Sequence, residues 1–156
     1  MSKKILIAFD DSENAQRAVE VVAQTFSRKS KVTLFSVAVD TEALCKMNSP
    51  ELTPYFKSQQ SAFCTMEDKK RELVETALTK AKKVLIDHGF AEDAIQIKHE
   101  NMDEGVARDI IRESKNNYDI VVIGRRGTSG IKEFFFGSTS QKVLNGIEDV
   151  SVFIVS

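Results

Sequence analysis

Glycine and hydroxyl residues in the last third of the chain have a spacing that could bind phosphate. Gly124 and Gly127 are followed, after nine further residues, by Gly137-Ser138-Thr139. Glycine lets backbone N–H groups approach an anion without a Cβ in the way. A helix beginning at Ser138 would add a partial positive charge and hydroxyl donors. This segment therefore predicts a phosphate-binding loop.

Two better-known phosphate motifs are absent from the sequence. A Walker A loop has four residues between its first glycine and a Gly-Lys pair, whereas Gly124 and Gly130 are separated by five residues and Ile131 follows. A dinucleotide fingerprint would follow the first strand, but no glycine occurs before Gly89. The loop belongs to neither class.

Strands and helices alternate along the chain and must position this loop. Apolar or alternating runs predict strands over residues 4–9, 31–39, 94–99, 119–123 and 151–155. Periodic apolar positions predict helices around residues 15–26, 66–88, 106–111 and 138–145. This alternation predicts one doubly wound α/β domain over residues 1–156, with a five-stranded parallel sheet of order 3-2-1-4-5 and helices on both faces.

Ligands of such sheets bind beyond the carboxyl ends of the strands, where the strand order reverses. That point lies between the first and fourth expected strands. Asp10, Asp11 and Ser12 follow the first strand, and the glycine loop follows Ile123. We expect these two segments to meet, although Asp10 and Asp11 could also serve only to cap the first helix.

The spacing G-x2-G-x9-G-[ST] after the strand 119–123 resembles the ATP-binding motif of the universal stress protein family. Residues 5–12 are similar to that family's first strand and acidic turn, and residues 35–39 to its second strand. The resemblance covers nearly the whole chain. It implies a regulatory module that binds ATP or a close adenine nucleotide, with Mg²⁺ or Mn²⁺ as a candidate counter-ion.

The resemblance also implies residue roles by position. Asp10 would lie near the ribose or adenine, Val37 would offer backbone groups to the adenine edge, and Arg126 could add a charge-assisted contact. Five residues would hold the phosphates: Gly124, Gly127, Gly137, Ser138 and Thr139.

Two positions depart from the family pattern. Asp11 stands where the family commonly has glycine, and its carboxylate would repel phosphates unless it faces away, caps the helix or shares a divalent cation. Arg125 replaces a residue that is commonly small and hydroxylic. Because of these departures, an alternative function stays open, in which the chain is a dimeric scaffold of the same fold that binds no nucleotide.

Phosphoryl-transfer chemistry has little support in the sequence. No general base, P-loop lysine or arginine finger is evident, so hydrolysis of ATP, if any, should be slow, and no catalytic residue is assigned. The acidic pair after the first strand also suggests a response-regulator receiver. However, no Asp occurs between Thr41 and Glu67 to accept a phosphoryl group, and the end, residues 153–156, lacks the expected Lys.

Composition and charge limit the classes of partner that we expect. The net charge is −1 and no apolar run approaches the roughly 20 residues of a membrane span, so we expect neither nucleic acid nor a membrane as partner. No signal peptide is evident, which predicts a cytoplasmic protein. The short apolar strand Val150–Val155 would leave an open edge that predicts a homodimer.

Residues 40–65 break the periodic pattern, with both prolines, several serines and two cysteines. We expect a long mobile insertion there, with Cys45 and Cys64 as plain thiols. His88 and His99 have structural interpretations only. The helix 66–88 should bury one face, formed by Leu73, Ala77, Ala81, Val84 and Leu85.

Overall fold

Five strands and five α-helices alternate in the computed structural model, which describes residues 2–10, 12–46, 53–125 and 138–156. In chain order the elements are β1 (Lys4–Ala8), α1 (Glu13–Thr25), β2 (Lys31–Ala38), α2 (Glu42–Cys45), α3 (Pro54–Asp87), a 3-10 turn (Glu92–Ala94), β3 (Ile95–Asn101), α4 (Val106–Ser114), β4 (Ile120–Gly124), α5 (Ser138–Gly146) and β5 (Ser151–Val155).

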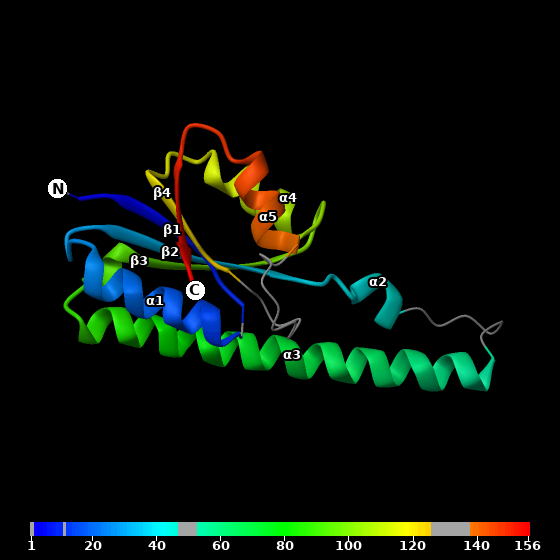
Figure 1. Ribbon diagram of the computed structural model, residues 1–156. Helices are drawn as coiled ribbons and strands as arrows, with labels where there is room; N and C mark the ends of the chain where they lie inside the picture. The colour runs from blue at the N-terminus through cyan, green and yellow to red at the C-terminus, as the bar shows by residue number, and fades with distance from the viewer. Residues whose placement is uncertain (1, 11, 47–52, 126–137) are drawn as a thin grey trace.

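The strands form one parallel sheet in the order β3-β2-β1-β4-β5, as the sequence predicts. Helices α1 and α3 cover one face, and α4 and α5 cover the other (Figure 1). Both faces of the central strands are therefore buried, which explains their continuous apolar sequences. Ile5 and Ile7 face α1 and α3, whereas Leu6 faces the α4 and α5 layer.

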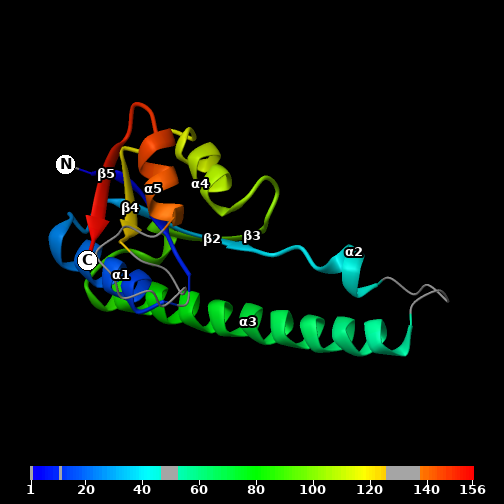
Figure 2. The same cartoon turned by 45° about the vertical axis from the view of Figure 1, so that its right-hand side comes forward.

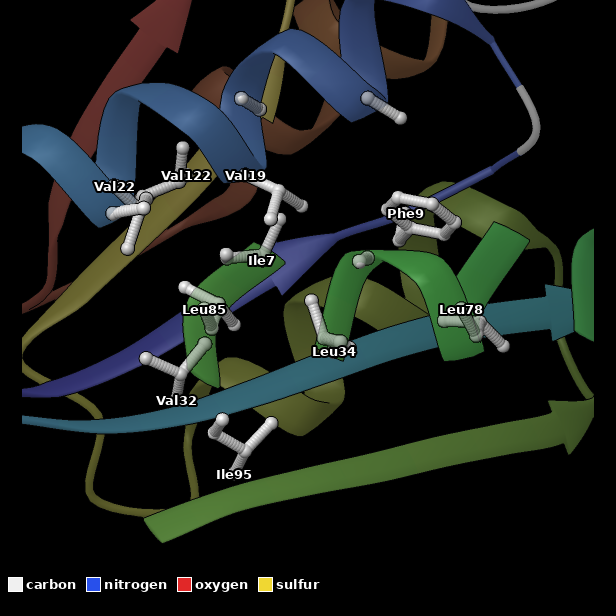
Figure 3. Close-up of a cluster of buried hydrophobic side chains, with 14 of the residues drawn as sticks. Ile7, Phe9, Val19, Val22, Val32, Leu34, Leu78, Leu85, Ile95 and Val122 are labelled. Atoms are coloured by element: carbon white, nitrogen blue, oxygen red, sulfur yellow. The ribbon is translucent and has the colours of Figure 1, made fainter. Parts of the chain in front are cut away.

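The larger core lies between the sheet and the α1–α3 layer. Figure 3 shows Ile7 and Leu34 from the sheet beside Val22 of α1 and Leu85 of α3. These four side chains have no exposed surface. This packing fixes α1 against the sheet and so sets the position of its first turn.

Ser12 precedes the first residue of helix α1. The Ser12 Oγ accepts a hydrogen bond of 3.1 Å from the Ala15 N–H, and the Asp10 carboxylate accepts one of 2.9 Å from the Ser12 N–H. Ser12 is therefore the N-cap, and Asp10 stabilises the turn before it. The capping expected of Asp11 lies outside the described residues.

The predicted long insertion over residues 40–65 is wrong for much of its length, because α2 and the first twelve residues of α3 lie within it. Thr53 caps α3 by accepting from the Phe56 N–H at 3.3 Å, and Pro54 occupies the first helical turn, where its missing N–H costs nothing. Helix α3 is thus 34 residues long. The proline that suggested a loop in the sequence is a helix start.

The expected buried face of this helix is also partly wrong. Leu73 is 60% exposed, and the neighbouring Val74 is buried at 7%. One residue corresponds to a rotation of about 100° in a helix, so the two side chains point in clearly different directions. The residues that pack on the core are Val74, Ala77, Leu78, Ala81 and Leu85.

The expectation that Cys45 and Cys64 are plain thiols is wrong. They form a disulfide, with their Cα atoms 5.9 Å apart, that links the end of α2 to α3. The expectation failed because an irregular segment gives no reason for the two residues to meet. Two helices lying side by side bring the Cα atoms into the range that a disulfide requires.

Membrane insertion has no support in the described residues. None of the helices there, including the 34-residue α3, is apolar enough over a sufficient length to cross a bilayer.

Candidate nucleotide site

The carboxyl edge of the sheet holds the candidate site at the boundary between β1 and β4. These strands pair in parallel, with Ile7 opposite Val122. After β1 the chain enters α1 on one face, and β4 is followed in the sequence by α5, which lies on the other face (Figure 2). This is the topological switch point, where ligands of open α/β sheets bind.

Asp10 lies at this edge, two residues beyond the end of β1. Its side chain is half-buried, and one carboxylate oxygen, Oδ1, is engaged by the Ser12 N–H. The N-terminus of α1 follows directly, so the carboxylate lies at the positive end of a helix dipole. Asp10 is held in place by its hydrogen bond to the start of α1.

Gly124, the last residue of β4, packs directly against α1. A Cβ added at Gly124 would lie 3.0 Å from the Cβ of Asn14 and 3.3 Å from its carbonyl carbon. A side chain at this position would therefore require Asn14 and the start of α1 to shift by a few tenths of an ångström. Close approach, and not an unusual backbone angle, is the reason for glycine at this position.

Helix α5 is anchored to the same glycine. The buried Ser140 donates a hydrogen bond from Oγ to the carbonyl oxygen of Gly124 at 2.7 Å. This bond places the first turn of α5, which starts at Ser138, beside the end of β4. Ser138 is exposed and Thr139 is half-buried. The N–H groups of a first helical turn have no partners within the helix, which makes this end suited to an anion.

Sequence reasoning missed Ser140. The signal was present as the third residue of the run Ser138-Thr139-Ser140, where only the first two hydroxyls were considered as phosphate contacts. The structure uses Ser140 to fix the position of the helix that carries the other two.

Val37 lies beyond the last pair that joins β2 to β1. The Phe9 N–H donates to the Phe35 carbonyl at 2.8 Å, which shows that backbone groups of Phe35 face β1. Groups two residues along a strand point the same way, so the N–H and carbonyl of Val37 also face that side. They are directed past the end of β1, where a flat ligand edge could reach them.

The remaining predicted contacts are outside the described residues. Arg126, Gly127 and Gly137 fall in the gap 126–137, and Asp11 is likewise not described. The chain just before this gap is held by the sheet, because the Arg125 N–H donates to the Val155 carbonyl at 2.7 Å. The loop therefore leaves from a defined point next to β5.

A hollow of about 450 Å³ runs along α1 from this edge. Its described lining consists of Glu13, Asn14, Gln16, Arg17, Glu20, Val21 and Gln24. Asn14 also contacts Gly124, so the hollow starts at the candidate site. Because the described lining includes two carboxylates and one guanidinium, this part of the surface is poorly suited to a polyphosphate, which carries several negative charges.

The turn after β3, at the same edge, is organised by a buried carboxylate that sequence reasoning did not single out. Asp109 is 3% exposed and accepts from the Asp103 N–H at 2.9 Å and from the Glu104 N–H at 3.0 Å. Arg112 also donates to it at 3.3 Å. Asp109 thus holds the chain between β3 and α4, a structural role.

Metal binding gains no direct support from the described part of the chain. Within it, no group of three or more His, Cys, Asp or Glu side chains is placed to hold a metal ion. A divalent cation at the site would therefore take at most two such side chains from the described residues and complete its coordination with other ligands, such as phosphate oxygens.

Comparison with known proteins gives a match over nearly the whole chain. Residues 1–155 match the sequence model of the Universal stress protein family. A search of curated proteins gave no match.

Several solved structures share the fold. Hypothetical protein MJ0577 has 22% identity and a TM-score of 0.69, over 98% of this chain and 94% of that one. UspA from Lactobacillus plantarum has 18% identity and a TM-score of 0.69, over 99% and 97%. A universal stress protein in complex with cAMP has 15% identity and a TM-score of 0.60, over 98% and 95%.

Proposed function

This chain belongs to the universal stress protein family, and from that premise we propose that it is a regulatory protein that binds ATP at the switch point between β1 and β4. The observation that carries the proposal is the anchoring of α5 to Gly124 by Ser140. This bond fixes an anion-binding helix end at the edge where Asp10 and the first turn of α1 also lie. This arrangement supports an anionic ligand, and the resemblance of the glycine spacing to the family's ATP-binding motif is what makes the expected ligand an adenine nucleotide.

The proposed contacts divide between the two ends of the ligand. Asp10 and the backbone of Val37 would hold the ribose and adenine. The phosphates would be held by Gly124, Arg126, Gly127, Gly137, Ser138 and Thr139. Three of these, within the gap 126–137, enter the proposal through the spacing of the motif alone.

The related universal stress protein in complex with cAMP is consistent with an adenine nucleotide on this fold. We favour ATP because the G-x2-G-x9-G-[ST] spacing supplies more anion donors than a single phosphate needs. Mg²⁺ or Mn²⁺ would accompany it through phosphate oxygens. Since the sequence has no evident general base, P-loop lysine or arginine finger for phosphoryl transfer, turnover should be slow at most. The proposal includes a location in the cytoplasm, where ATP is abundant.

The direct test is to denature the purified protein and identify any released nucleotide by mass. Added ATP with magnesium should raise the melting temperature, because a ligand that binds only the folded state stabilises it. Gly127→Ala and Gly137→Val should remove that shift. Absence of both released nucleotide and thermal shift in millimolar ATP would contradict the proposal and favour the scaffold alternative.

A matched pair of hydroxyl variants sharpens this test. Ser138→Ala with Thr139→Val removes two proposed phosphate donors while leaving the Ser140 anchor in place, and should weaken ATP binding by about tenfold or more. Ser151→Ala, an exposed serine on β5, is the control and should bind ATP normally. If the two variants bind ATP with equal affinity, Ser138 and Thr139 do not contact the phosphates.

The proposal includes a homodimer through β5, which lies at one edge of the sheet. The Ser151 N–H donates to Asp119 and the Val155 carbonyl accepts from Arg125, so odd-numbered residues face β4. The N–H groups of Val152 and Ile154 therefore face the open edge. Val152→Pro removes one outward donor without breaking the β4 ladder, and should weaken a β5 dimer in light scattering.

A further inference from the structure

An apolar stripe lies along the part of α3 that projects past the sheet. Figures 1 and 2 show this N-terminal half extending beyond β2 and β3, with α2 beside it. Tyr55, Met66 and Leu73 are 72%, 58% and 60% exposed, and Ala62 is also exposed. At 100° per residue these four residues fall within about 40° of one another around the helix. We call them the outer stripe.

The protein's own fold uses a different side of this helix. Gln60 donates to the carbonyl of Leu44 in α2, and Cys64 forms the disulfide with Cys45. Arg71 donates to the carbonyl of Val39. These inner residues are rotated by roughly 140–180° from the outer stripe. The disulfide therefore holds α3 to α2 on the side of the helix opposite the outer stripe, and the stripe faces outward.

The sequence of the outer face has the same spacing in both directions. From Tyr55 to Leu73 its positions are Tyr55, Gln59, Ala62, Met66, Lys69 and Leu73, at intervals of four, three, four, three and four. The order is apolar, polar, apolar, apolar, polar, apolar from either end. A two-fold axis between antiparallel helices pairs each position with the one equally far from the centre of the segment. This pattern therefore sets apolar residues against apolar ones and polar residues against polar ones.

We propose that the outer stripe binds a second copy of this chain, with the two α3 helices antiparallel. In that arrangement Tyr55 packs on Leu73 of the other copy, and the small Ala62 packs on the longer Met66 of the other copy. Gln59 faces Lys69 of the other copy, whose ammonium group can donate to the amide oxygen. All six positions then have a suitable counterpart.

Charge selects the antiparallel over the parallel arrangement. Parallel helices in register would place Lys69 against Lys69 of the other copy, and like charges in contact are unfavourable. Tyr55 would also meet Tyr55, leaving Leu73 to meet Leu73. The antiparallel contact has a length of about 27 Å along each helix, and it is separate from both the β5 edge and the nucleotide site.

The first test separates this interface from pairing through β5. All proteins carry Val152→Pro, so that any remaining dimer depends on another surface, and association is measured by analytical ultracentrifugation. Met66→Glu with Leu73→Glu should weaken association at least tenfold. The control is Ser61→Glu with Thr79→Glu, which adds the same charge to exposed positions about 120° from the stripe. The control should associate normally, and helicity should be unchanged in both proteins.

The second test checks orientation. Tyr55→Cys with Leu73→Cys should form disulfide-linked dimers through residue 55 of one copy and residue 73 of the other, mapped by peptide mass. Each single cysteine variant should not crosslink, because in an antiparallel pair identical positions lie about 27 Å apart.

Several results would overturn the proposal. One is a Val152→Pro protein that stays monomeric at all concentrations. Binding of that monomer to anionic lipid vesicles through the stripe would also count against a second copy as the partner. Another is equal association of the stripe and control variants, and a third is efficient crosslinking of Tyr55→Cys alone. Each is independent of nucleotide binding, which is scored separately by the thermal shift with ATP.

Discussion

The two halves of α3 both carry apolar side chains but have different surroundings. From Val74 to Leu85 the helix packs on the core, and Leu85 has no exposed surface. From Pro54 to Leu73 it projects beyond the sheet, with large apolar side chains exposed. Apolar residues therefore stabilise this helix only where the sheet gives them a partner, and the other half needs another source of order.

The projecting half obtains that order from covalent and polar contacts. The Cys45–Cys64 disulfide links it to α2, and Arg71 connects it to the ends of β2 and β3 through Val39 and Asn101. Most helical stability in proteins comes from tertiary packing, which this half has little of. We therefore expect the two halves to differ in how substitutions and reduction affect them.

The largest contrast should come from shortening equivalent leucines. Leu85→Ala removes fully buried methyl groups and should lower the free energy of unfolding by about 2–5 kcal/mol. Leu73→Ala removes an exposed side chain and should change it by about 0.5 kcal/mol or less. Urea denaturation of both variants, followed by circular dichroism at low protein concentration, measures the difference. Equal losses would show that the projecting half has a buried face after all.

Removal of the disulfide should have the next largest effect, confined to the projecting half. Cys45→Ser with Cys64→Ser opens a loop of 19 residues, and crosslinks of that size typically contribute about 2–4 kcal/mol. Hydrogen exchange should accelerate over residues 54–70 and stay slow over residues 74–85. Reducing agent added to the unaltered protein should reproduce the pattern. Uniform acceleration along α3 would mean that the helix unfolds as one unit.

The strands could be predicted from the sequence, whereas the projecting half of α3 could not. Each strand is a short apolar run that only a buried sheet position explains, and all five were placed within two residues of their observed ends. Residues 54–65 have no such pattern, because their apolar side chains serve no buried face. Pro54 was interpreted as a loop residue, although it occupies the helix start with Thr53 as its cap.

The candidate site was predictable in its location but not in its local contacts. The switch point follows from strand order, so Asp10, Gly124 and Ser138 were expected at one edge. The contact between Gly124 and Asn14 and the Ser140 anchor depend on how α1 and α5 pack, which spacing alone does not encode. The ligand roles of the eight residues remain predictions.

Arg71 marks the boundary between the two halves, and its loss should have a smaller effect. Its guanidinium donates to the Val39 carbonyl at 3.3 Å and to Asn101 Oδ1 at 3.2 Å. Arg71→Ala should lower the free energy of unfolding by about 1 kcal/mol, because both bonds are solvent-exposed. The neighbouring exposed Lys70→Ala is the control and should have no measurable effect. If the two variants unfold alike in urea, Arg71 does not hold the junction.

The smallest effect should be a pH dependence at the same boundary. Burial of His99 in β3 lowers the pKa of its imidazole, and the positive charge of Arg71 lowers it further. The carboxylate of Glu75 in α3, whose Oε1 lies 3.8 Å from His99 Nδ1, raises this pKa and partly offsets the shift. The folded state therefore favours the neutral ring, while the unfolded chain titrates near pH 6.5. The stabilising contribution is complete above about pH 6.5 and is lost as the pH falls below it.

His99→Gln should remove this component, so its free energy of unfolding should depend less on pH between about 5 and 7 than that of the unaltered protein. His88→Gln is the matched control for the second histidine, which caps α3 at its other end with the ring Nδ1 2.8 Å from the Val84 carbonyl. Urea titrations at several pH values make the comparison. If His99→Gln keeps the full pH dependence, protonation of His99 does not affect the junction between the two halves of α3. The order of the projecting half is then independent of this histidine.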